Sequence, residues 1–104
     1  MNKHKIIWSP RALEELNRSY KYISYNLMET NTARNLYNKI MKSVSGLKYF
    51  PGRYPDLSYY GNADKNFRRL RVDNFIIIYR LNSKTRDIFI LHIFHSKQNY
   101  FNLI

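Results

Sequence analysis

The chain has 104 residues and no cysteine, and its 18 Lys and Arg against 7 Asp and Glu give a formal net charge of +11. At this length we expect one domain, residues 1–104, with one core. The absence of cysteine excludes disulfides and thiolate metal sites. Seven acidic residues are too few to favour glycosidase or two-metal chemistry. The charge predicts attraction to polyanions such as nucleic acid, the ribosome or an acidic protein.

The N-terminal part predicts a strand followed by a helix. Residues 4–8 form a short apolar run, and Ser9-Pro10 supplies an N-cap hydroxyl and a proline at the first helical position. Glu14 and Glu15 fall in early turns, where the helix dipole favours negative charge. Apolar side chains recur at spacings of three and four, which predicts a helix of about five turns with one buried stripe: Leu13, Leu16, Tyr20, Ile23 and Leu27.

A second helix is predicted from the capping segment 30–32 to the stop at Phe50-Pro51-Gly52. Its buried stripe is expected to be Ala33, Leu36, Ile40, Val44 and Leu47. The short break between the helices indicates an antiparallel helical hairpin. Residues 53–64 show no period and predict a loop over the core. Phe50, Tyr54 and Tyr59 are expected to cover the end of the hairpin.

Three strands are predicted in the last third of the chain, at 66–72, 75–81 and 87–95. Asp73-Asn74 is expected to form a tight turn and residues 82–85 a polar hairpin loop. The segment 75–81 is the most apolar, so we expect it to be central. The prediction is therefore an α+β fold in the order β-α-α-β-β-β, with the helical hairpin on one face of a small, mostly antiparallel sheet and the other face open for function.

A basic cluster on two of these strands is the first candidate site. It comprises Arg68, Arg69, Arg71 and Arg80. Strand alternation puts Arg69 and Arg71 on one face, and Arg68 with Leu70 on the other. If Leu70 faces the helices, Arg69 and Arg71 face the open side, where guanidinium groups suit an RNA backbone or a phosphodiester transition state. The alternative is a solvated basic face that binds an acidic partner protein.

The C-terminal segment holds the other candidates. His92 and His95 fall on opposite faces of the last strand, and either could act as an acid or base or have only a structural role. Tyr100 could stack on a base or donate a proton, or could simply anchor the tail. No metal site is expected, because the two histidines cannot easily share an ion and no acidic cluster stands beside them. No phosphate-binding or dinucleotide motif is present, so no cofactor is expected.

The order and spacing of several segments resemble a known superfamily. Residues 7–16 resemble the opening of ParE-like proteins, in which a strand precedes Ser-Pro-x-Ala and an acidic amphipathic helix. Tyr22-Ile23 resembles the family's Y-I pair, and 47–51 its L-x-x-x-P helix exit. Residues 69–80 resemble its basic hairpin, and 90–95 its closing strand. The chain is thus similar, over nearly its whole length, to the RelE/ParE toxins of bacterial type II toxin–antitoxin systems.

This resemblance implies a toxin that arrests growth, stabilises plasmids and is neutralised by a cognate antitoxin. Operator DNA would be contacted only through the antitoxin. RelE-like members are ribosome-dependent mRNA endonucleases, whereas ParE-like members are described as inhibitors of DNA gyrase. No stretch is apolar for long enough to be a signal peptide or a membrane span, so we expect a cytoplasmic protein without a membrane partner.

The departures from RelE favour the ParE-like branch. RelE has a catalytic arginine in its central strand, where this chain has Ile76 or Ile78, and further basic residues after the last strand, where this chain offers only Lys97. The ParE-like tail H-x-x-R-(D/N) is matched only in part, because Gln98 stands near the arginine position. We therefore predict inhibition by binding, with this target or nucleic-acid surface: Arg68, Arg69, Arg71, Arg80, His92 and Lys97.

Two alternatives remain open. An endoribonuclease acting on ribosome-bound mRNA would use Arg69 and Arg71 on phosphate, with His95 or Tyr100 in proton transfer, because other nuclease members place His and Tyr near the C-terminus. A degenerate, non-toxic member would be retained only for antitoxin binding and repression of its own operon.

Overall fold

The computed structural model describes residues 4–57 and 66–96 of the chain. Its elements follow the predicted α+β order: β1 (Ile6–Trp8), α1 (Pro10–Lys21), a π-helical turn (Tyr22–Asn26), α2 (Thr30–Gly46), a 3-10 turn (Pro51–Arg53), β2 (Phe67–Val72), β3 (Phe75–Leu81) and β4 (Ile88–His95). The predicted first helix of about five turns is thus shorter, because regular α-helical geometry stops at Lys21 and one wider turn completes it.

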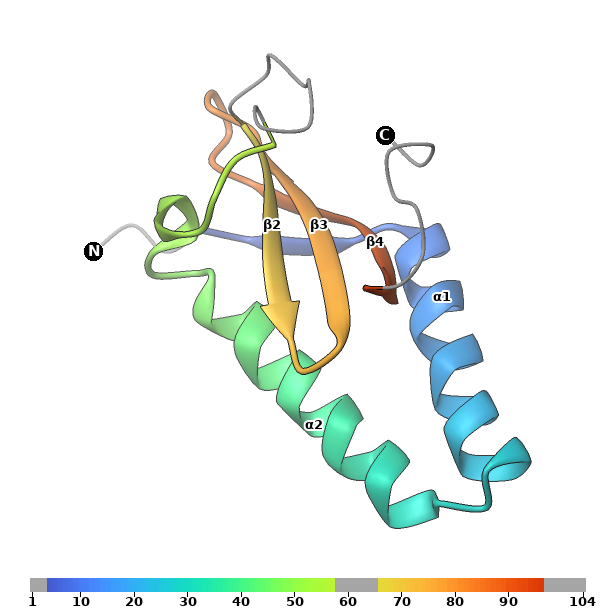
Figure 1. Ribbon diagram of the computed structural model, residues 1–104. Helices are drawn as coiled ribbons and strands as arrows, with labels where there is room; N and C mark the ends of the chain where they lie inside the picture. The colour runs from blue at the N-terminus through green and yellow to red at the C-terminus, as the bar shows by residue number, and fades with distance from the viewer. Residues whose placement is uncertain (1–3, 58–65, 97–104) are drawn as a thin grey trace.

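The four strands form one mixed sheet in the order β1-β4-β3-β2. β1 pairs with β4 in parallel, and the other two pairs are antiparallel, as the prediction of a mostly antiparallel sheet requires. β3 has a strand on each side, which confirms its central place. Figure 1 shows the two helices diverging from their connection, with α1 beside the end of β4 and α2 below the β2–β3 turn.

The main core fills the space between the helices and one face of the sheet. Its buried members are Ala12, Leu16, Ile40, Val44, Leu47, Leu70, Val72, Ile77, Tyr79, Ile88, Ile90 and Ile93. Leu70 therefore faces the helices, as the interpretation of the arginine cluster assumed.

The buried stripe of the first helix differs from the predicted one. Leu13 is 45% exposed and Leu27 49% exposed, so the prediction that they belong to the core is wrong. The face turned to the sheet passes instead through Ala12 and Leu16, four residues apart and both buried. Leu13 lies about 100° around the helix from Ala12, which turns its side chain towards solvent.

The second helix begins without the predicted side-chain cap. Its cap residue is Glu29, whose side chain makes no capping hydrogen bond, and the Ala33 N–H donates to the Glu29 carbonyl at 3.0 Å. Met28 just before it has a φ of 53°, in the left-handed region. The buried positions Ala33, Ile40 and Val44 nevertheless follow the predicted stripe.

The end of the helical hairpin is covered differently from the prediction. Phe50 was expected to cover the end of the hairpin, but its side chain is 66% exposed. Pro51 is buried in its place, and its carbonyl accepts a hydrogen bond from the Tyr79 hydroxyl at 2.6 Å. This contact holds the chain with Pro51 inward. Tyr54 packs against the main core as expected, whereas Tyr59 lies outside the described residues.

Candidate functional site

The sheet face opposite the helices, here called the far face, carries three rows of side chains set by strand register. Each row runs from β2 through β3 to β4. The three rows are Arg69–Ile78–His92, Arg71–Ile76–Phe94 and Phe67–Arg80–Phe89. Arginines of β2 and β3 therefore surround an aliphatic centre.

The centre of the far face is a second apolar cluster, which corrects the prediction of an open face. Ile78 is fully buried and Ile76 and Phe94 are nearly so. Leu57 joins them from a segment that pairs with β2, where the Leu57 N–H donates to the Phe67 carbonyl at 3.1 Å. Apolar side chains on this face therefore exclude water, and the arginines stand around them.

The guanidinium groups of Arg71 and Arg80 each have a defined contact on the far face. The Arg71 side chain is exposed, and its Nε donates to the Asp73 carbonyl at 2.9 Å. The Arg80 guanidinium lies 5.5 Å from the centre of the Phe67 ring, within cation–π range. This arrangement can attract a carboxylate or a phosphate while apolar surface lies next to it.

Arg68 has a different place, on the helix side of β2. Its Nη1 donates to the Tyr54 carbonyl at 2.6 Å and to the Gly52 carbonyl at 3.2 Å. These contacts fix the segment that follows the second helix. Beside it, burial raises the pKa of Tyr79, while the charge of Arg68 opposes that shift. Arg68 and the Tyr79 hydroxyl thus hold the same turn.

The position of His92 depends on a β-bulge. The register of β3 and β4 shifts between Ile78, which pairs with His92, and Tyr79, which pairs with Ile90. The extra residue, Leu91, puts His92 on the far face and returns Ile93 to the main core. The two histidines lie on opposite faces, as predicted. Strict alternation from Ile88 would have put His92 on the helix side and His95 on the far face, and the bulge reverses both positions.

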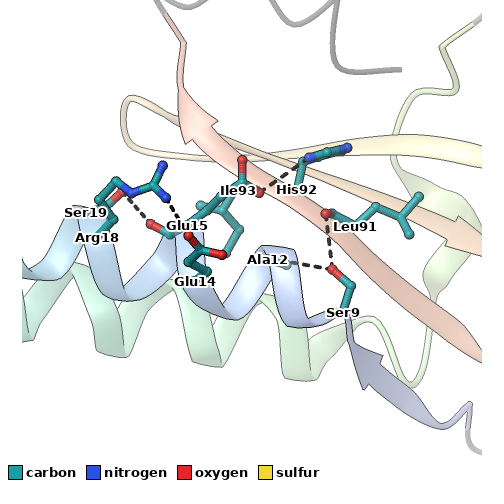
Figure 2. A network of polar contacts seen from close by, with 9 residues as sticks. All are labelled: Ser9, Ala12, Glu14, Glu15, Arg18, Ser19, Leu91, His92 and Ile93. Atoms are coloured by element: carbon teal, nitrogen blue, oxygen red, sulfur yellow. Dashed lines mark hydrogen bonds and ion pairs between the residues drawn. The ribbon is translucent and has the colours of Figure 1, made fainter.

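Helix α1 completes the edge of β4 that β1 leaves unpaired (Figure 2). The Ser9 hydroxyl accepts from the Ala12 N–H at 3.0 Å and donates to the Leu91 carbonyl at 3.2 Å. Glu15 Oε1 accepts from the Ile93 N–H at 3.2 Å and lies 3.4 Å from His92 Nδ1. The predicted N-cap is confirmed, and Glu15 is a direct partner of the sheet.

His95 lies on the opposite side of the sheet from the far-face arginines, in a groove between the helices and the end of the sheet that we call the hairpin groove. Two adjoining cavities of about 410 and 510 Å³ form it, and both are lined by Tyr22, Ile23, Phe75 and His95. The His95 ring meets Phe75 edge to face, with ring centres 5.5 Å apart. The groove is mainly apolar and opens beside exposed tyrosines of the hairpin.

The structure thus divides the predicted site residues among several places. Arg69, Arg71, Arg80 and His92 share the far face; Arg68 and His95 lie on the helix side; Lys97 and Tyr100 lie outside the described residues. From the sequence, Glu15 was explained only by the helix dipole, because no local pattern links it to the Ile93 N–H, 78 positions away.

Within residues 4–57 and 66–96, no three His, Cys, Asp or Glu side chains gather closely enough to hold a metal ion. None of the helices in that part of the chain combines the length and apolar character needed to cross a membrane.

Solved structures with the same fold come from toxin–antitoxin systems. The chromosomal ParDE system of P. aeruginosa contains a chain that is 17% identical, with a TM-score of 0.74 over 93% of this chain and 100% of that one. The toxin–antitoxin complex RelBE2 of Mycobacterium tuberculosis contains a chain that is 14% identical, with a TM-score of 0.67 over 94% of this chain and 97% of that one. A doubly substituted E. coli toxin RelE in the free state is 9% identical, with a TM-score of 0.70 over 97% of this chain and 92% of that one.

The fold is therefore that of the RelE/ParE toxins. A sequence model described as the ParE toxin of the type II toxin–antitoxin system parDE matches residues 6–100. The chain belongs to this ParE toxin family, which confirms the predicted branch. A search of curated protein sequences found no match.

Proposed function

We propose that this toxin acts by binding, as an inhibitor of an essential target such as DNA gyrase, and that a cognate antitoxin neutralises it. The observation that carries the proposal is the separation of the two arginines from His95, while His92, the histidine that shares their face, is buried and lies 3.4 Å from Glu15. Arg69 and Arg71 stand on the far face, whereas His95 lies in the hairpin groove on the helix side.

The centre of the far face supports the same conclusion. General acid–base cleavage of RNA needs polar groups that converge on one phosphate. Here the residues between Arg69 or Arg71 and β4 are Ile78 and Ile76, which are buried and apolar. A basic rim around an apolar centre is better suited to holding a protein surface than to proton transfer.

The same surfaces fit an antitoxin. A net charge of +11, the far-face arginines and the apolar hairpin groove complement an acidic, amphipathic segment that folds on binding. The similar chains from P. aeruginosa and M. tuberculosis belong to ParDE and RelBE2 systems, which supports an antitoxin partner for this chain as well. We expect the affinity of that complex to fall with rising salt concentration.

Two assays on the purified toxin test the mechanism together. We expect loss of gyrase supercoiling activity and no new mRNA ends on translating ribosomes, mapped by primer extension. Cleavage in the ribosomal A site would instead assign an endonuclease, with Arg69, Arg71, His95 and Tyr100 as the first residues to change. Growth arrest with both assays negative would contradict gyrase as the target, and absence of growth arrest would contradict toxicity itself.

A further inference from the structure

A hollow with two lysines lies between β1 and α2, apart from both the far face and the hairpin groove. It has a volume of about 380 Å³ and lies between Lys5, just before β1, and Lys48, just after α2. Half-buried Trp8 and Met41 supply apolar walls, and Ser45 adds a hydroxyl. None of the described residues that line it is acidic.

Exposed aromatic rings continue from this hollow along the chain. Residues 48–54 read Lys-Tyr-Phe-Pro-Gly-Arg-Tyr, a segment with two cations, three aromatic rings and no acid. Phe50, which was expected to cover the end of the helical hairpin, is 66% exposed. The Arg53 guanidinium lies 5.2 Å from the centre of the Tyr54 ring. A large exposed ring among cations points to a ligand with flat faces and negative charge.

We propose that this surface, formed by Lys5, Trp8, Lys48, Phe50 and Arg53, binds an unpaired nucleic-acid strand. Lys5 and Lys48 come from different elements and would contact backbone phosphates on either side of the hollow. Phe50 offers a ring face on which a base stacks, which requires a strand whose bases are not already paired and stacked in a duplex. Phosphates and bases are common to DNA and RNA, so the surface chemistry accepts either polymer.

The proposal does not depend on gyrase as the target. The β1–α2 surface uses residues other than those of the far face and the hairpin groove, so a strand bound there leaves both accessible to a protein. A toxin occupied by its antitoxin on those other surfaces would retain the nucleic-acid contact.

The test is fluorescence anisotropy of labelled sixteen-nucleotide (dT) and (rU) strands, and of a duplex of equal length, titrated with the full-length toxin at several salt concentrations. We expect single strands to bind more tightly than the duplex. Phe50→Ser is expected to weaken single-strand binding at least about fivefold. The double variant Lys5→Gln/Lys48→Gln is expected to reduce the slope of log K against log salt by about 1.4.

A matched control separates a local site from the overall charge of the chain. The double variant Lys21→Gln/Arg34→Gln removes the same charge from exposed positions on the two helices, and Tyr25→Ser removes an exposed ring at their connection. Both are expected to bind nearly as the unchanged chain does, and circular dichroism checks the folding of all variants.

The proposal is overturned if the control variants weaken binding as much as the β1–α2 variants, because the attraction would then be diffuse. It is also overturned if the duplex binds as tightly as the single strands, or if Phe50→Ser has no effect. Tighter binding of (dT) or of (rU) supports the proposal and identifies the polymer, and equal binding supports the contact to phosphate and base alone.

Discussion

The two faces of the sheet use the same three strands for different chemistry. The helix side presents Leu70, Ile77 and Tyr79 to a continuous core. On that side Arg68 of β2 donates to the carbonyls of Gly52 and Tyr54. The far face also buries apolar side chains, but arginines of two strands stand around them. Both faces therefore contribute buried apolar side chains to the fold, but the far face also carries arginines of β2 and β3 beside its apolar cluster.

The largest effect is expected from opening the helix-side core. Ile77 is fully buried on the central strand, so Ile77→Ala should lower the free energy of unfolding by about 2–5 kcal/mol, through lost burial and a residual cavity. Urea unfolding monitored by circular dichroism measures this. A loss below about 1 kcal/mol would contradict the assignment of Ile77 to the principal core.

The next effect concerns the edge between the two faces, where Glu15 accepts from the Ile93 N–H. Glu15→Ala leaves that donor without its acceptor and should cost about 1–3 kcal/mol in the free energy of unfolding. Glu14→Ala is the matched control, because the Glu14–Arg18 pair is 69% and 72% exposed and should contribute less than about 0.5 kcal/mol. Equal losses in the two variants would show that Glu15 acts only as a helical charge.

Local periodicity predicted the regular parts of both faces. Alternation in β2 put Leu70 and Arg69 on opposite faces, because the side-chain period of an extended strand is two, and the structure turns Leu70 towards the helices. The bulge in β4 could not be predicted in this way, since it follows from pairing with β3 at a distance in sequence. Alternation alone therefore could not place His92.

The remaining differences also come from tertiary contacts. A hydrophobicity pattern favours Leu13 over Ala12, but the helix turns its small Ala12 to the sheet, and the Leu13 side chain remains exposed. Glu15 could not be linked to Ile93 from the sequence, because 78 positions separate them and β1 must end before Glu15 can reach the strand edge. The helix dipole was thus the only local explanation for this acid.

A smaller, pH-dependent effect is expected for Tyr79 on the helix side. Tyr79→Phe removes the hydroxyl that donates to the Pro51 carbonyl and should cost about 1 kcal/mol at pH 8. Burial raises the pKa of Tyr79 above that of the unfolded chain, so the unfolded state loses its proton first. The stabilisation is complete below a pH of about 10 and declines as pH rises further.

Urea unfolding at pH 8 and pH 11 tests this sign. The difference in unfolding free energy between the unchanged protein and Tyr79→Phe should shrink at the higher pH. Tyr25→Phe, at an exposed position, serves as the control and should show little difference at either pH. A difference that grows with pH would contradict the buried, protonated state of Tyr79.

The smallest effect on stability, and the most direct test of the contrast between the faces, is expected from the far-face arginines. Arg71 is exposed, and its Nε donates to one backbone carbonyl, so Arg71→Ala should change the free energy of unfolding by less than about 0.5 kcal/mol.

If an acidic antitoxin docks on this face, Arg71→Ala should slow association several-fold at low salt, because a rim charge acts mainly on the encounter rate. Stopped-flow association with purified antitoxin measures this rate, and Lys84→Ala removes an equal charge from the exposed β3–β4 loop. An equal effect of both variants would assign the attraction to net charge alone, and would remove the far face from the binding surface.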